Sequence, residues 1–148
     1  MAEVSDEALA RSWHELMGRY NRLACRLDRE LGSAHGLSSS EFEVLQQLDA
    51  CAVQGELRMA DLAHRVHLSQ SALSRLVGRL ERDGLVLRAA CEADRRSVWI
   101  RITDAGRTRC AEARPTQRAI LRTETWCAAQ LPPGDAQPAG PSSPNHPA

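Results

Sequence analysis

The segment from Met59 to Ile102 constrains the fold most, because its hydrophobic periodicity changes part-way along it. Up to Gly84 the apolar residues recur every three or four positions, which is the spacing of an amphipathic helix. After Gly84 apolar and polar residues alternate, as they do in a half-buried β-strand. The sequence therefore predicts a mainly α fold that contains one small β-hairpin.

Two short helices are predicted before the hairpin. The first fits residues 59–66, and Ser69 is placed to cap the second, which Gly84 ends. One stripe of the second helix is apolar and faces inward: Leu73, Leu76, Val77 and Leu80. Its other side exposes polar residues. Two short helices of this kind, joined by a tight turn, form a helix-turn-helix.

A β-hairpin with a charged tip is predicted to follow. Residues 85–88 and 97–102 alternate, and the later segment places Val98, Ile100 and Ile102 on one face. A helix-turn-helix followed by a hairpin is a winged helix-turn-helix, which suits duplex DNA. The second helix is narrow enough to enter the major groove, and an arginine at the hairpin tip can reach the neighbouring minor groove.

The charge of the chain is concentrated in this middle part. The formal net charge is zero, from 19 arginines and 19 acidic residues, which excludes a globally basic, histone-like protein. Residues 56–110 nevertheless hold eleven arginines against seven acidic residues, a net charge of +4, and the rest of the chain carries −4. A local excess of positive charge is the footprint expected of a nucleic-acid-binding surface.

Helices are also predicted before the winged unit. Residues 5–31 show helical spacing of apolar residues, and Gly32 and Gly36 bracket the end of this helix. It is long for a domain of this size, so we expect it to pack against more than its own core. Ser38 and Glu41 form a capping box that opens a second helix.

The C-terminal part is predicted to hold one more helical region and a tail. Thr103 caps this region, Pro115 kinks or splits it, and it ends near Leu131. Residues 132–148 contain six of the seven prolines and no apolar side chain larger than alanine. Such a segment cannot bury enough surface to offset its ordering entropy, so we expect a disordered tail.

Several motifs occur here in a specific order. They are LRMADLAHRVHL (57–68), SQSALSRLVGRLERDG (69–84), Leu85-Val86 with Arg88, Asp94-Arg95-Arg96, and Ile102-Thr103-Asp104-Ala105-Gly106. In this order they resemble the MarR family of bacterial transcription regulators. The resemblance implies a homodimer that binds a pseudo-palindromic operator in double-stranded DNA, and a repressor that a small-molecule effector relieves. Residues 1–131 would then form one domain, with a DNA-binding lobe at about 37–104 between dimerisation helices at about 5–32 and 104–131.

The resemblance also implies which residues contact DNA: Ser69, Gln70, Ser71, Ala72, Ser74, Arg75, Asp94, Arg95 and Arg96. In the recognition helix Arg75 would face the bases, together with Ser71 and Ala72. In the wing, Arg95 would enter the minor groove, whereas its neighbours on either side would hold the wing in shape or contact the DNA backbone. Arg79 and Arg82 are not assigned, because acidic residues lie beside them.

The first helix carries the candidate effector residues Trp13, His14, Met17 and Tyr20. In the family such a pocket lies between the dimer helices and the DNA-binding lobe. Packing within the core or between subunits is the alternative that we favour for these side chains.

Because a proline-rich tail stands where relatives carry a final helix, we expect a weaker two-fold dimer. Ile120, Leu121, Trp126 and Cys127 would add a short apolar strip to the interface.

The cysteines leave a second function open. Their number is five, which is odd, and without close pairing or an export signal we expect free thiols. Cys91, in the predicted wing, is the most exposed candidate. Cys51, Cys110 and Cys127 fall on helical inner faces. A thiol-based redox-sensing regulator therefore remains an alternative, as does a winged helix used for protein–protein interaction.

Other functions have little support. His64 and His67 would lie three residues apart on one helix, but no further ligands complete a metal set, so we predict no metal and no cofactor. The chain lacks the Gly-rich phosphate loop, GxSxG and HExxH motifs, and we predict that it is not an enzyme. No apolar stretch is long enough for a membrane span, and the N-terminus is acidic, so a cytoplasmic location is expected.

Overall fold

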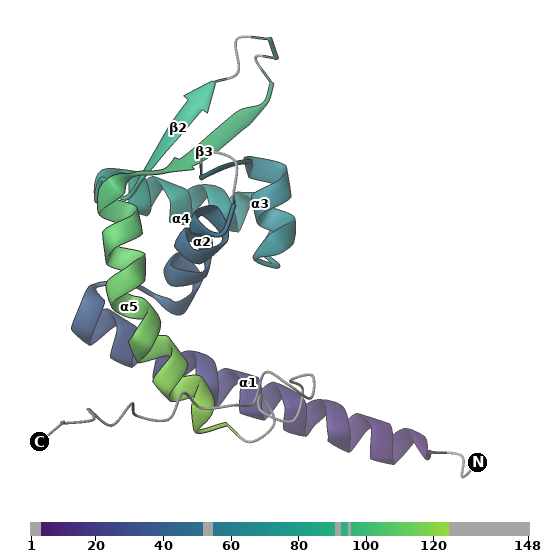
Figure 1. Cartoon of the computed structure of the whole chain (residues 1–148). Helices are drawn as coiled ribbons and strands as arrows, with labels where there is room; N and C mark the ends of the chain where they lie inside the picture. Colours follow the sequence, from purple (N-terminus) through teal and green to yellow (C-terminus); the bar gives the residue numbers. More distant parts are fainter. Residues whose placement is uncertain (1–3, 52–54, 91–92, 95, 125–148) are drawn as a thin grey trace, which may run out of the picture.

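The computed structural model describes residues 4–51, 55–90, 93–94 and 96–124 (Figure 1). Within them it has five helices and one three-stranded antiparallel sheet. The elements are α1 (Asp6–His35), α2 (Ser39–Asp49), β1 (Glu56–Arg58), α3 (Met59–Arg65), α4 (Gln70–Arg82), β2 (Val86–Ala90), β3 (Val98–Ile102) and α5 (Asp104–Arg122). This confirms a mainly helical winged helix-turn-helix.

Helix α1 is capped at both ends, and its two halves differ. The Ser5 hydroxyl accepts a hydrogen bond from the backbone N–H of Ala8, and Gly36 ends the helix in the left-handed conformation, at φ 67°. The C-terminal half packs on α5 and buries Leu23 and Leu31. In Figure 1 the N-terminal half extends away from the other elements.

Helices α2 and α4 have the predicted caps. Ser38 and Glu41 form the complete capping box of α2, and the Ser69 hydroxyl accepts from the N–H of Ala72 at the start of α4. One apolar core joins these helices to the sheet. Its fully buried members include Phe42, Leu45, Leu48, Leu62, Leu73, Leu80, Leu85 and Ile100.

The hairpin is confirmed, with one addition and one correction. Strand β3 lies between β2 and the short strand β1, which the periodicity did not predict. A strand of three residues is too short for alternation to be visible. The inner face of β3 is formed by Ile100 and Ile102, whereas Val98 is exposed, because it lies at the end of the strand nearest the hairpin tip.

Helix α5 differs from two expectations. The helix continues through Pro115 instead of splitting there. Its last residue is Arg122, and residues 125–131 of the predicted helical region lie outside the described residues. Buried residues on both sides of the proline hold it against α1 and α2, and this packing outweighs one missing backbone hydrogen bond. Ile120 is buried within the chain, so it is not part of an exposed strip, and Trp126 and Cys127 lie outside the described residues, as does the predicted tail.

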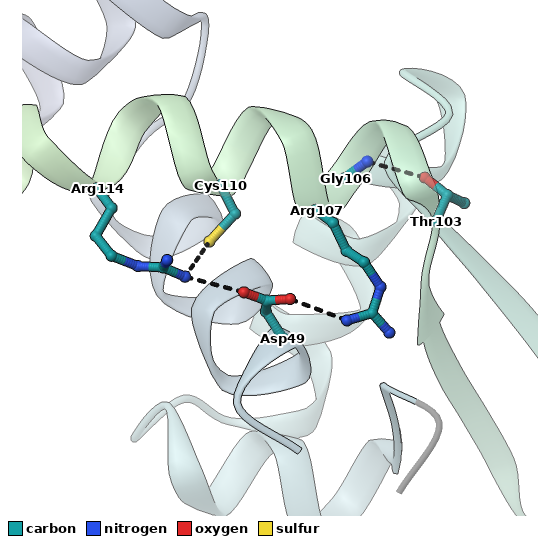
Figure 2. A network of polar contacts seen from close by, with 6 residues as sticks. All are labelled: Asp49, Thr103, Gly106, Arg107, Cys110 and Arg114. Carbon is teal, nitrogen blue, oxygen red and sulfur yellow. Dashed lines mark hydrogen bonds and ion pairs between the residues drawn. The ribbon is translucent and has the colours of Figure 1, made fainter. Parts of the chain in front are cut away.

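Ion pairs join α5 to the DNA-binding lobe (Figure 2). Each carboxylate oxygen of Asp49, at the end of α2, accepts a hydrogen bond of 2.9 Å: one from Nη1 of Arg107 and the other from Nη2 of Arg114. The Arg114 guanidinium also lies 3.7 Å from the Sγ of Cys110, and the hydrogen bond with Asp49 is the main cause that raises the pKa of Arg114. Asp49 thus bridges two turns of α5.

Candidate nucleic-acid interface

Helix α4 presents a polar face on the side opposite the core. Its apolar stripe is buried, and Ser71, Arg75 and Arg82 are exposed on the other side, at intervals of four and seven residues, which place them on a single helix face. Gln70 is exposed as well, whereas Ala72 and Ser74 are half-buried on the flanks of the helix. A helix with such a face can enter the major groove of duplex DNA.

A polar groove separates the start of α4 from the wing. It has a volume of about 390 Å³ and lies between α3, α4 and the strands of the wing. Gln70 and Ser74 line it from the helix, and Arg96 lines it from the wing. Arg58 and Arg88 add two further guanidinium groups, and the acidic residue of the lining is Asp61. The groove is therefore positively charged.

Arg88 fixes the position of the wing relative to α4. Its Nη2 donates to the backbone carbonyl of Ser74 over 2.8 Å, and its backbone N–H donates to Oε2 of Glu81. A Cβ added at Gly78 would lie 3.8 Å from the same guanidinium. Because Gly78 has no side chain, Arg88 can lie close to the backbone of α4 at this point. Arg88 belongs to one of the motifs that resemble the MarR family, but the sequence did not show that its side chain connects β2 to α4.

Asp94 accepts two hydrogen bonds within the described part of the hairpin tip. Its Oδ2 accepts from the Ser97 hydroxyl over 2.7 Å, and its Oδ1 accepts from the N–H of Arg96. These two hydrogen bonds are the main reasons that the pKa of Asp94 is lowered, with a smaller contribution from the positive charge of Arg58. Asp94 thus has the wing-shaping contacts expected of it. Arg95, the predicted minor-groove residue, lies outside the described residues.

The wing-tip carboxylate gives a pH-dependent prediction. Replacing Ser97 with alanine removes the strongest bond to the ionised form of Asp94, so its pKa is expected to rise toward the ordinary aspartate value. The tip is held while this carboxylate is charged, and that contribution is lost as the pH falls through the lowered pKa. The measurement is an NMR titration of the Asp94 side-chain carboxyl. An unchanged pKa in Ser97→Ala would contradict the hydrogen bond.

The remaining arginines of α4 differ in their partners. Arg79 Nε lies 3.1 Å from Oε1 of Glu41, which also completes the capping box of α2. It is therefore engaged inside the lobe, and its partner is not the neighbouring Glu81. Arg82 is exposed at the end of the helix.

The candidate effector residues do not share one cavity. A cavity of about 210 Å³ lies where α1, α2 and α5 meet, and of the four candidates only Tyr20 lines it. Trp13 and Met17 lie with Tyr20 along an exposed apolar strip, and His14 lines a different depression. The cavity is completed by residues that the sequence did not single out: Leu23, Leu27, Leu31, Phe42, Glu43, Val66, Leu68 and Gln117. They come from distant parts of the chain, so no local pattern could reveal them.

Three cysteines lie in the described residues, and the two histidines beside the turn correct one local expectation. Cys25 is exposed, Cys51 is half-buried and Cys110 is buried, and all three are free; Cys91 lies outside the described residues. Burial raises the pKa of the Cys110 thiol, which lowers its reactivity. His64 and His67 do not share a helix, because α3 ends at Arg65 and His67 adopts a left-handed turn, at φ 56°.

Comparison with known proteins shows which family this chain resembles. The model of the MarR family matches residues 37–98. The crystal structure of Sco3205, a MarR family transcriptional regulator from Streptomyces coelicolor in complex with DNA, aligns with a TM-score of 0.75 and 26% identity, covering 91% of this chain and 82% of that chain. Over residues 37–98 this chain is similar to the MarR family, and its fold is that of the MarR-family regulators of known structure. The family is one of transcriptional regulators rather than enzymes, as predicted.

Curated relatives match a shorter part. The transcriptional activatory protein BadR of Rhodopseudomonas palustris is 38% identical over 74 residues, or 50% of this chain and 42% of BadR. The regulator PecS of Dickeya dadantii is 31% identical over 94 residues, or 62% of this chain and 57% of PecS. The chain thus spans about half the length of these relatives.

Two features are absent from the described part of the chain. None of its helices is both long and apolar enough to cross a membrane. Nor do its His, Cys, Asp and Glu side chains come together in threes or more in a way that could hold a metal ion.

Proposed function

We propose that this chain is a sequence-specific DNA-binding transcriptional regulator, a repressor that a small-molecule effector relieves. One observation carries the proposal: an exposed polar helix face and a hairpin wing lie on the two sides of an arginine-lined groove. A helix and a wing so placed can occupy adjacent major and minor grooves. Sco3205, which shares this fold, was solved in complex with DNA. A regulator of this kind acts in the cytoplasm, where it meets the DNA.

The test is a binding titration with DNA from upstream of the chain's own coding region. Labelled duplexes of this DNA and of the same base composition in scrambled order are titrated at several salt concentrations. Tighter binding to the upstream DNA, falling steeply with salt, is the expected result. Equal affinity for both duplexes would contradict sequence-specific recognition of this DNA. No binding at low salt would contradict DNA binding itself and favour the alternative of a protein–protein module.

The exposed strip on α1 supports a dimer. Trp13 and Tyr20 are 62% and 65% exposed, and Leu9, Leu16 and Met17 are exposed on the same half of the helix. An apolar strip of this length is typical of an interface, and a two-fold axis would place two recognition helices on one face of the DNA, about one helical turn apart.

Sedimentation tests this prediction with a single charge. The wild type is expected to sediment as a dimer at micromolar concentration, and Trp13→Glu to weaken the dimer by at least about tenfold, because it places two like charges in the interface. Leu87→Glu is the matched control, since Leu87 is 54% exposed on β2 and lies outside the strip. A wild type that stays monomeric at tens of micromolar, or a Trp13 variant that matches the control, would contradict this interface.

The effector is proposed to occupy the cavity where α1, α2 and α5 meet. Its lining is mainly apolar, and the polar residues among those that line it are Tyr20, Ser39, Ser40, Glu43 and Gln117. A small aromatic or aliphatic ligand with one polar group fits this chemistry. A ligand held between the long helix and the DNA-binding lobe can change the spacing of the two recognition helices, which relieves binding when the spacing no longer matches the half-sites.

A further inference from the structure

Arg58 has an unusual place in the groove beside the wing. It is the last residue of β1 and the N-cap residue of α3, but its side chain makes no capping hydrogen bond. Its guanidinium carbon instead lies 5.3 Å from the centre of the Trp99 ring. This distance is within the range of a cation–π interaction, and a stacked guanidinium keeps its N–H groups free at the edges.

The sheet accounts for the stacking. Arg58 is the register partner of Trp99 across β1 and β3, so both side chains emerge on the same face. On its other side Trp99 pairs with Ala89 of β2, whose small side chain leaves room for the indole. The half-buried ring is therefore held in place by the backbone ladder and offers a platform for the arginine.

The groove leaves the charge of Arg58 available. Arg88, its neighbour in the lining, is already engaged by the carbonyl of Ser74 and the carboxylate of Glu81. Arg58 takes part in none of the ion pairs found among the described residues, and it is exposed. A cation that is positioned by stacking and open to solvent can bind an anion at little cost in side-chain entropy.

The geometry of duplex DNA indicates which anion would reach this position. If α4 enters the major groove and the wing enters the neighbouring minor groove, the DNA strand that separates the two grooves must cross the gap between them. Its phosphates then pass over the groove that Arg58 lines together with Gln70 and Arg96. Contacts of this kind position a protein on DNA without reading its sequence.

We propose that Arg58, held on the ring of Trp99, is a phosphate-binding residue that fixes the DNA strand between recognition helix and wing. This inference rests on the proposed DNA-binding function. It adds a contact on β1 and α3 that neither the recognition helix nor the wing tip supplies, and it assigns a role to an aromatic ring on the hairpin that packing of the core does not require.

The experiment compares two charge-neutralising variants on the same DNA. Arg58→Gln is expected to reduce affinity for upstream and scrambled duplexes by the same factor. It should also reduce the slope of log affinity against log salt by about 0.9 for each bound protomer, the value for one phosphate contact. Arg101→Gln is the matched control: Arg101 lies on β3, is paired with Glu56 over 2.7 Å, and is not part of the groove lining. Its salt slope is expected to equal that of the wild type.

A third variant tests the platform. Trp99→Leu keeps the charge of Arg58 but removes the ring, so affinity is expected to fall while the loss of slope is smaller than in Arg58→Gln. Circular dichroism melting checks that each variant is folded. If Arg58→Gln and Arg101→Gln have the same slope, or if Arg58→Gln loses affinity for the upstream duplex only, the inference is overturned while the proposed function stands. A wild type that binds neither duplex overturns the proposed function, and this contact with it.

Discussion

Replacing Arg75 with alanine is expected to cost about 1–3 kcal/mol of operator affinity in each half-site and to relax the sequence preference. Arg75 is exposed near the middle of the outer face of α4, directly opposite the buried stripe. An arginine in this place can donate two hydrogen bonds to the edge of a guanine in the major groove. Because a two-fold dimer carries two such residues far apart, the costs add to about 2–6 kcal/mol for the whole operator.

The signature of base reading is a loss that depends on sequence. Titration of Arg75→Ala should show a large decrease in affinity for the upstream duplex and a small one for the scrambled duplex. Arg122→Ala removes the same charge from an exposed position at the end of α5, far along the chain and outside the interface, and should leave both affinities unchanged. An Arg75 variant that loses affinity equally for both duplexes would make Arg75 a phosphate contact and remove it from the readout.

The local features of this fold could be predicted because their causes are local. The capping box of Ser38 and Glu41, the cap at Ser69 and the change of period after Gly84 each involve residues a few positions apart. Such patterns place helices and strands along the chain, and therefore also the exposed face of the recognition helix. They predict less well where packing intervenes, as at Pro115, where buried neighbours keep the helix continuous.

The candidate functional features outside the helix-turn-helix depend on contacts between residues that lie far apart in the sequence. Strand β1 exists through its pairing with β3, more than forty positions later, and only this pairing brings Arg58 onto Trp99. The hydrogen bond from Arg88 to the carbonyl of Ser74 holds the wing on α4. Because its acceptor is a backbone atom, which every residue has, the sequence does not indicate this bond. The cavity below the lobe likewise gathers residues from α1, α2 and α5.

Replacing Gly106 with alanine is expected to destabilise the protein by about 1–3 kcal/mol or more, the largest effect on stability among the glycines. Thr103, which caps α5, donates its hydroxyl proton to the carbonyl of Gly84 over 2.7 Å, and its N–H donates to the carbonyl of Leu85. These bonds draw the first turn of α5 onto the corner between α4 and β2. Figure 2 shows the N–H of Gly106 directed at the Thr103 hydroxyl from this turn.

A methyl group at Gly106 has no space. The added Cβ would collide with the carbonyl oxygen of Leu85 and lie 2.8 Å from Cγ1 of Ile102, and both neighbours belong to the buried corner. The carbonyl oxygen of Leu85 is a backbone atom and cannot move by a change of rotamer, so the start of α5 must shift. Arg107 and Arg114 lie on the turns of α5 that follow, so their ion pairs with Asp49 of α2, which join α5 to the lobe, would be strained as well.

Two alanine variants are expected to shift the melting temperature in opposite directions. Gly106→Ala should lower the melting temperature by several degrees, since 1 kcal/mol corresponds to about 2–8 °C in domains of this size range. Gly78 lies half-buried in the middle of α4, and the nearest neighbour of an added Cβ there is the Arg88 guanidinium, at 3.8 Å. Gly78→Ala should therefore raise the melting temperature, because alanine favours helix over glycine by up to about 1 kcal/mol. Equal melting temperatures for Gly106→Ala and the wild type would mean that α5 is not held tightly against the lobe. An effector bound at its other end could then move the helix without moving the wing.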